Sequence, residues 1–304
     1  MSLSVQRILL IGCGDVALRI AAMLRGRARV IGLTRRADDT PKLRQHGIVP
    51  LVADLDDVAS LRRLNTAPWA VVHLAPPPAE GRDDPRTQKL LAALSRAQII
   101  PRRFVYISTS GVYGDCGGAR IDETHPRRAQ TPRARRRVAA EDRLRAWAAR
   151  ARVPLAVLRA PGIYAETRLP LERIRQGTPV LAPDDDVFTN HIHADDLARA
   201  IIHAIYHGQP NRAYNVCDDA EMKMGGWFDM VADAHQLPRP PRVSWEEAEQ
   251  RIAPILLSFM SESRRLANTR MTRELRVRLA YPTPQTLLAA VVPRQLKKQL
   301  PLAL

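Results

Sequence analysis

The most constraining feature of this chain is an apolar run that leads straight into the segment Gly12-Cys13-Gly14-Asp15-Val16-Ala17. Residues 8–11 predict a short buried strand, and Gly-x-Gly-x-x-Ala predicts a tight turn from that strand into a helix. The first glycine permits the turn, the second lets a pyrophosphate approach the backbone, and the helix N-terminus offers free N–H groups to phosphates. We therefore predict a dinucleotide-binding unit rather than a tight turn without a ligand. The predicted cofactor contacts in this loop are Gly12, Cys13, Gly14, Asp15 and Val16.

The end of the second predicted strand indicates which dinucleotide is preferred. This strand runs into Thr34, Arg35 and Arg36. Chains that prefer NAD place Asp or Glu about 20 residues after the glycines to bind the ribose 2′-hydroxyl, and that acid is missing here. A guanidinium and a hydroxyl suit a 2′-phosphate instead. We predict NADP over NAD, with Arg35 as the main ligand, because Asp38 and Asp39 come late in the loop for a ribose acid.

Strands and helices alternate through the first two thirds of the chain. This alternation predicts an α/β fold, a Rossmann-type doubly wound parallel sheet with helices on both faces. The predicted strands are 8–11, 28–33, 48–53, 70–74, 103–108, 155–159 and 213–216, with helices at 87–97, 135–150 and 195–205 and, after residue 217, near 226–235 and 245–256. We predict an NAD(P)-binding Rossmann domain over residues 1–164, to which 191–217 return, and a smaller C-terminal substrate lobe made of 165–190 and 218–304.

Composition narrows the expected compartment and partners. No apolar stretch reaches the roughly 18 to 20 residues that span a bilayer, and the early first strand leaves no room for a signal peptide, so a cytoplasmic protein is expected. Cys13, Cys116 and Cys217 are widely spaced, which predicts neither a disulfide framework nor a metal site. The net charge is +16, yet only five of the 47 basic residues are lysines. We expect a solvated, arginine-rich surface rather than a nucleic-acid site; the alternative would use the cluster from Arg127 to Arg137.

Further segments follow the glycine loop in a regular order: Asp54-Leu55, His73-Leu74-Ala75, 105–114, 158–164, 192–198 and 214–216. Together they resemble the extended (atypical) short-chain dehydrogenase/reductase superfamily, in its NAD-dependent epimerase/dehydratase branch. The resemblance implies an adenine contact at Asp54 and a substrate lobe that often holds a nucleotide-linked sugar. It implies that Thr109 polarises the substrate oxygen, with Ser108 as the substitute if the register slips by one. The remaining cofactor contacts it implies are Leu55, Leu74, Ala75, Pro76, Ser108, Arg137 and Pro161.

The chain departs from this family at the proton relay, which is Tyr-x-x-x-Lys on the helix after the fifth strand. Aligning that helix on Glu141 puts Arg133 at the tyrosine position and Arg137 at the lysine position. An arginine in a protein does not lose its proton, so Arg133 cannot be the acid or base. Arg137 can still supply positive charge and hydrogen bonds to the ribose, although as a planar fork.

Other groups are therefore candidates for the acid/base work. They are Tyr113, Tyr164 and His193, and each also has a plain structural role. Tyr113 would pack beside the site, and His193 would cap the helix that begins near Asp195. Arg159 is a candidate for the substrate crevice, as is Asn190.

Two functions of different classes follow. The first is an NADP-binding oxidoreductase that acts on a hydroxyl or carbonyl substrate, polar or anionic. The second is a catalytically degenerate NADP-binding sensor that has lost the relay. A homodimer would pair through the long helices after the fourth and fifth strands, although the arginines at the start of the second helix would repel across a two-fold axis.

Overall fold

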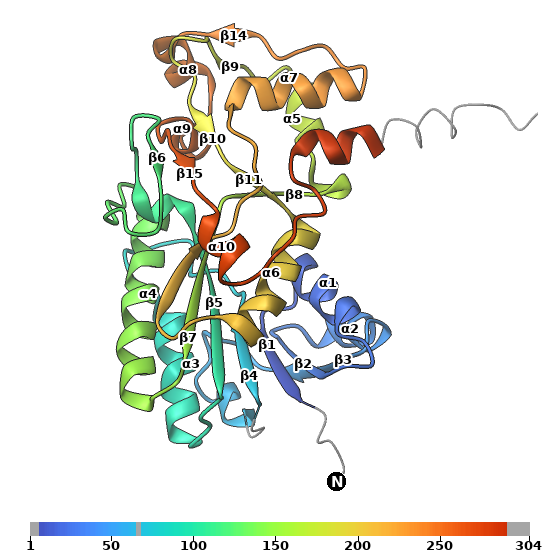
Figure 1. Cartoon of the computed structure of the whole chain (residues 1–304), viewed down its shortest axis with the longest axis vertical. Coiled ribbons are helices and arrows are strands. Elements are labelled where there is room, and N and C mark those ends of the chain that lie inside the picture. Colours follow the sequence, from blue (N-terminus) through green and yellow to red (C-terminus); the bar gives the residue numbers. More distant parts are fainter. Residues whose placement is uncertain (1–5, 65–67, 291–304) are drawn as a thin grey trace, which may run out of the picture.

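The centre of the molecule is a seven-stranded parallel sheet in the order β12-β7-β5-β4-β1-β2-β3 (Figure 1). The computed structural model describes residues 6–64 and 68–290. The strands of this sheet are β1 (Arg7–Ile11), β2 (Arg29–Thr34), β3 (Ile48–Val52), β4 (Ala70–His73), β5 (Arg103–Thr109), β7 (Leu155–Ala160) and β12 (Arg212–Asn215). The strand order reverses between β1 and β4, which is where open α/β sheets bind ligands.

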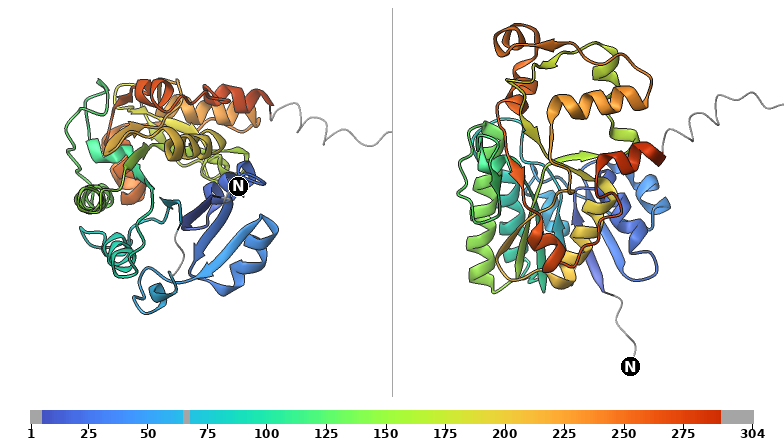
Figure 2. Two further views of the ribbon diagram at one scale, coloured as in Figure 1. Left: turned by 60° about the horizontal axis from the view of Figure 1, so that its bottom comes forward. Right: turned by 45° about the horizontal axis from the view of Figure 1, so that its top comes forward.

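Helices cover both faces of the sheet, as the alternation of strands and helices predicted (Figure 2). One layer contains α1 (Asp15–Met23), α2 (Thr40–Gln45) and α6 (Ala194–His207); the other contains α3 (Pro85–Arg96) and α4 (Pro132–Ala151). The sides of β1 are divided between two apolar cores: Ile8 and Leu10 pack in the first, and Leu9 and Ile11 in the second. This strand is apolar on both sides because both faces of the sheet are covered.

A second region lies beyond the carboxyl ends of the strands (Figure 1). Its helices are α5 (Leu171–Arg175), α7 (Met224–Ala234), α8 (Trp245–Arg251) and α9 (Pro254–Met260). Paired short strands connect distant segments: β6 (Arg120–Ile121) with β15 (Arg265–Leu266), β8 (Gly162–Tyr164) with β11 (His191–His193), β9 (Val180–Leu181) with β14 (Arg242–Val243), and β10 (Phe188–Thr189) with β13 (Met222–Lys223). The short 3-10 helices are η1 (Ala37–Asp39), η2 (Ser60–Arg63), η3 (Ser110–Tyr113) and η4 (Glu166–Arg168).

The Rossmann-type fold and its seven strands are confirmed, and one predicted helix was wrong in extent. The helix expected over 245–256 is two helices, α8 and α9, separated at Ile252 and Ala253. Ala253 has ψ 138°, an extended conformation. The ring of Pro254 disfavours a helical conformation at the residue before it, so the first helix ends and a second begins.

The end of the described chain returns to the sheet. Helix α10 (Thr269–Arg273) lies beside β12, and Met271, Leu275 and Val277 join the core that contains α1 and α6. These residues therefore pack on the sheet, although the predicted lobe 218–304 included them. The rest of the predicted division stays a prediction, and residues 291–304 lie outside the described part of the chain.

Residues 6–64 and 68–290 contain neither a membrane-spanning helix nor a cluster of metal ligands. No helix there is both long and apolar enough to cross a membrane. No group of three or more His, Cys, Asp or Glu side chains in the same ranges is arranged to hold a metal ion. Cys13, Cys116 and Cys217 are free thiols.

Candidate active site

The glycine loop between β1 and α1 leaves space where a pyrophosphate would lie. Gly12 has φ +98°, which favours glycine, and a Cβ on it would come within 2.9 Å of the Ala75 backbone nitrogen. A Cβ on Gly14 would meet no atom within 4 Å. No described side chain caps α1, so its first N–H groups are available at this open position. The loop therefore fits the phosphates of a dinucleotide.

The other predicted residues of this loop have distinct surroundings. The Cys13 thiol donates to the Leu33 carbonyl at 3.4 Å, and burial raises its pKa to about 12. Asp15 is exposed in the first turn of α1 and pairs with Arg19 at 3.1 Å and Arg168 at 3.6 Å. Two guanidinium groups thus flank the loop, while the thiol points toward β2.

The structure places an acid, Asp39, at the end of β2, although its position in the sequence did not predict this. Asp39 lies in η1, which folds back so that its Oδ2 accepts a hydrogen bond from Thr34 Oγ1 at 3.2 Å. Arg36 pairs with the same carboxylate at 2.8 Å. Arg35 is exposed. The hydrogen bond from Arg86 lowers the pKa of Asp56, and the charge of Arg35 adds a smaller effect in the same direction. Arg35 is therefore open to a ligand, whereas Arg36 is already paired.

The loops after β3 and β4 lie next to the glycine loop. The backbone N–H groups of Leu74 and Ala75 both donate to the Ile11 carbonyl, at 2.9 and 2.8 Å. These bonds hold Ala75 against Gly12. Asp54 is half-buried, its Oδ1 accepts from the Asp56 N–H at 2.9 Å, and Leu55 behind it is buried. Pro76 is exposed, and its carbonyl accepts from Arg86 at 3.2 Å.

At the end of β5, two adjacent hydroxyls point to opposite sides. Successive side chains of a strand alternate between faces, and Ser108 faces α4, where it donates to Glu141 Oε1 at 2.6 Å and is buried. Thr109 is half-buried, and its Oγ1 accepts from the Gly111 N–H at 3.3 Å. Its hydroxyl hydrogen has no acceptor among the described residues. Thr109 is thus the hydroxyl available to a ligand.

Behind Thr109 runs a buried polar network. Arg159 pairs with Glu141 at 2.8 Å and donates to the Tyr113 hydroxyl at 2.9 Å, which in turn donates to Asn215 Oδ1 at 2.7 Å. Burial raises the pKa of Tyr113 to about 12. The expectation that Arg159 lines a substrate crevice was wrong, because its guanidinium is buried in this network. The acid/base role of Tyr113 stays a prediction, and its hydroxyl is bonded on both sides.

The two arginines predicted to occupy the relay positions extend in different directions. Arg133 extends from the first turn of α4 to α9, where it donates to Ser258 Oγ at 2.7 Å and stacks over the Phe259 ring at 3.6 Å. Arg137 turns to the end of β5, where it donates to the Tyr106 hydroxyl at 3.1 Å and the Ile107 carbonyl at 2.9 Å. Arg137 therefore brings its charge near the strand that carries Thr109.

The remaining acid/base candidates are structurally engaged. His193 Nδ1 accepts from the Asp195 N–H at 3.2 Å, which confirms its capping role at the start of α6. Tyr164 is buried among the rings of His191, His193 and Trp227, and burial raises its pKa well above the usual range. Pro161, a predicted cofactor contact, is half-buried between β7 and β8.

A family model described as "NAD dependent epimerase/dehydratase family" matches residues 14–217, more than half of the 304-residue chain. The chain belongs to the NAD-dependent epimerase/dehydratase family. Among its relatives are the mouse dTDP-D-glucose 4,6-dehydratase, 23% identical over 48% of this chain and 53% of that protein, and the Pseudomonas aeruginosa GDP-6-deoxy-D-mannose reductase, 29% identical over 56% and 64%. The chain thus matches only about half to two thirds of these relatives' length.

Solved structures resemble this family member over almost its full length. A Silicibacter pomeroyi protein of unknown function is 30% identical, with a TM-score of 0.78 over 95% of this chain and 99% of that one. The Thermotoga maritima UDP-glucose 4-epimerase, solved with UDP-glucose, has a TM-score of 0.77 at 17% identity over 96% and 99%. The Bacillus anthracis dTDP-glucose 4,6-dehydratase, solved with NAD, has a TM-score of 0.76 at 16% identity over 97% of each chain. The last two show a shared fold.

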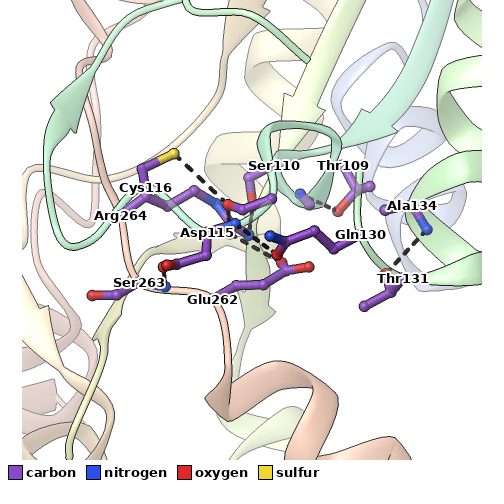
Figure 3. Close-up of polar contacts among 12 residues, drawn as sticks. Thr109, Ser110, Asp115, Cys116, Gln130, Thr131, Ala134, Glu262, Ser263 and Arg264 are labelled. Carbon is purple, nitrogen blue, oxygen red and sulfur yellow. Dashed lines mark hydrogen bonds and ion pairs between the residues drawn. The ribbon is translucent and has the colours of Figure 1, made fainter. Parts of the chain in front are cut away.

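Two charged residues of this family member escaped the sequence analysis. Glu262 and Arg264, which follow α9, reach the turn after β5 (Figure 3). Arg264 donates to Glu262 Oε2 at 3.0 Å and to the Gly114 carbonyl at 2.8 Å. Asn190 is half-buried, and its amide bonds the backbone of Arg264 and Leu266, each at 2.9 Å; its place in a substrate crevice stays a prediction. Nothing local marks these residues, since they lie about 150 positions after Thr109 in a stretch without a motif.

Proposed function

We propose that this chain is an NADP-dependent oxidoreductase of the atypical extended short-chain dehydrogenase/reductase type, acting on a hydroxyl or carbonyl substrate. The observation that carries the proposal is the open position above Gly14 at the switch point of the sheet, with the half-buried Thr109 hydroxyl two strands away on β5. Membership of an NAD-dependent family supports a nicotinamide cofactor. The dehydratase and reductase relatives support a nucleotide-linked sugar or a similar metabolite as the substrate.

Three residues have defined roles in this proposal. The nicotinamide, when bound, would supply or accept the hydride. Thr109 donates its free hydroxyl hydrogen to the substrate oxygen and so polarises the C–O bond. Arg137 holds positive charge near the end of β5, at the family's lysine position. Arg133 binds and orients rather than transferring a proton, since a guanidinium stays protonated.

The preference for NADP rests on Arg35, because the buried Thr34 hydroxyl already bonds Asp39. Arg35 is exposed at the end of β2 and is suited to a 2′-phosphate. Asp39 is the opposing feature, because a carboxylate at this position suits ribose hydroxyls. Arg36 pairs with Asp39 and offsets its charge, which favours NADP. A cytoplasmic location and a homodimer through α3 and α4 stay expectations from the sequence.

The experiment that tests the proposal is a fluorescence titration of the purified chain with NADPH and with NADH. We expect NADPH to bind at least tenfold more tightly. Arg35→Ala is expected to reduce that preference by about tenfold, since a charge-assisted hydrogen bond contributes about 1.5–3 kcal/mol. Arg44→Ala, which removes an exposed arginine from α2, is the matched control and should leave both affinities unchanged.

The outcomes separate the two function classes. Binding of neither nucleotide would overturn the dinucleotide site, and equal binding of both would overturn the NADP preference. If NADPH binds, hydride exchange between the bound cofactor and carbonyl compounds supports the enzyme. Tight stoichiometric binding without any exchange supports the sensor instead.

A further inference from the structure

Two buried charged side chains beside Thr109 are only partly paired. Glu262 is 5% exposed and Arg264 is 8% exposed. Glu262 Oε1 and Arg264 Nε have no hydrogen-bond partner, although both are shielded from solvent. Buried polar atoms are nearly always paired, so an unpaired acceptor and an unpaired donor on neighbouring side chains call for an explanation.

These side chains lie at the turn that follows Thr109. A Cβ on Gly111 would be 3.7 Å from Glu262 Oε2, from Thr109 Cγ2 and from Ala134 Cβ. Arg264 also approaches Ser110 Oγ, at 3.5 Å. Figure 3 shows Arg264 reaching toward Ser110 and Glu262 on the same side of the turn, with Gln130 between Glu262 and Thr109 in this view. The charged pair thus lies at the turn that directly follows Thr109.

A second guanidinium lies close by, because Arg133 donates to Ser258 Oγ at 2.7 Å and Ser258 precedes Glu262 by four residues. Arg133 is half-buried, and burial lowers its pKa, while Glu262 raises that pKa and Arg264 lowers it further. The three side chains carry two positive charges and one negative charge. Their unpaired hydrogen-bonding atoms are a carboxylate oxygen, which accepts, and a guanidinium N–H, which donates. Together the three side chains have a net charge of one positive. The complementary group is an anion that also carries a hydroxyl.

We infer that Arg133, Glu262 and Arg264 form a subsite for a hydroxy acid, whose acid group binds the two guanidiniums and whose hydroxyl donates to Glu262 Oε1. This inference names the substrate class of the proposed oxidoreductase and rests on that function. Arg264 binds the acid group, and Glu262 accepts the hydrogen bond from the ligand hydroxyl. Thr109 would bond the oxygen of that hydroxyl. A sugar acid and a small hydroxy acid share this chemistry.

Few contacts separate this subsite from solvent. Ser263, between the two charged residues, accepts hydrogen bonds from the Cys116 and Gly118 N–H groups, both at 3.0 Å, and donates its N–H to Asp115 Oδ1 at 2.8 Å. Next to these bonds, the two-residue strands β6 and β15 pair with each other and join the same two segments. Entry of a ligand requires segment 261–264 to part from loop 114–118, which breaks these three hydrogen bonds and the one from Arg264 to the Gly114 carbonyl.

Malonate and tartronate make a sharp test, because tartronate is malonate with one added hydroxyl. Calorimetric titration of the full chain with each should give at least tenfold tighter binding of tartronate. Arg264→Gln is expected to weaken both probes by tenfold or more. Glu262→Gln is expected to reduce the tartronate preference to about twofold or less. Arg265→Gln, which removes the same charge from the adjacent residue, should change neither affinity more than about twofold.

The comparison of the two probes on the unmodified chain needs no variant, so a variant that fails to fold does not block the test. Equal affinities, or no binding of either probe, would overturn the inference. The titrations need no cofactor, so they are independent of the NADPH titration. If NADPH binds and the probes do not, only the subsite falls; if the probes bind and NADPH does not, the proposed oxidoreductase falls.

Discussion

At the scale of single residues, the pair Glu141–Arg159 anchors the polar interior behind Thr109. Burial by itself raises the pKa of Glu141, but the hydrogen bonds and charge of Arg159 outweigh it and leave that pKa below its usual range. The carboxylate side chain is 0% exposed and that of Arg159 is 4% exposed. A buried ion pair is costly to break from one side only, because the remaining charge stays buried without compensation.

Arg159→Met is therefore expected to lower the free energy of unfolding by about 3–5 kcal/mol. The double variant Glu141→Gln/Arg159→Met should lose clearly less than the sum of the two single variants, since it leaves no unpaired charge. Urea unfolding of the four proteins measures this coupling. Additive losses would contradict it.

At the scale of elements, helix α3 depends on a buried cap. The Asp84 carboxylate accepts from the Thr87 N–H at 3.1 Å and from the Thr87 hydroxyl at 2.7 Å, and Pro85 follows at the first helical position. The same hydroxyl lies 3.0 Å from His73 Nε2 at the end of β4. The cap thus connects the start of α3 to a strand of the site.

Asp84→Ala is expected to lower the free energy of unfolding by about 1–2 kcal/mol, at the upper end for a cap because the position is buried. Glu80→Ala, which removes an exposed acid from the preceding loop, is the control and should change stability by less than about 0.5 kcal/mol. Thermal and urea unfolding give both values. Equal effects of the two substitutions would refute the cap.

At the scale of the whole molecule, Asp218 lies where the last strand of the sheet leads into the second region. Its N–H donates to the His191 carbonyl at 2.8 Å. Burial raises the pKa of its carboxyl to about 8, and the charges of Asp219 and Asp196 add to this effect. An ordinary aspartate has a pKa of about 3.9. Between these values the folded protein binds more protons than the unfolded chain.

The free energy of unfolding is therefore expected to fall, through this group, as pH rises from about 4 to about 8. Asp218→Asn should remove this decline. The free energy of unfolding of the variant minus that of the unmodified chain should therefore increase from about pH 4 to about pH 8 and stay constant at higher pH. Asp184→Asn, which removes an exposed acid that does not affect the pKa of Asp218, is the control. Urea unfolding at several pH values tests this; a constant difference across the window would be the contrary result.

Several arginines of the cluster from Arg127 to Arg137 bond to other parts of the molecule. Arg127 pairs with Asp142 at 2.7 Å, Arg136 donates to the Gly81 carbonyl at 2.6 Å, and Arg133 and Arg137 bond inside the protein. Much of the positive charge that suggested a nucleic-acid surface is thus directed inward. Nucleic-acid binding stays the weaker alternative.

The parts of the fold that are encoded locally could be predicted. Strands such as β1 and β4 are continuous apolar runs because both of their faces are buried, and the glycine loop marks its own turn. The two-residue strands β6, β9 and β15 could not be predicted, because such pairs have no periodicity of their own and form only when distant segments meet. The division of α8 from α9 was missed although Pro254 marked it.

By itself, the sequence determined the order of strands and helices and the glycine turn between β1 and α1, since each depends on residues close together in the chain. Only the tertiary structure decided that Thr109 rather than Ser108 keeps a free hydroxyl, that Asp39 folds back onto Thr34, and that Glu262 and Arg264 meet the turn after β5. The physical reason is that a side chain's hydrogen-bond partners and burial are set by contacts across the fold, which local spacing does not encode.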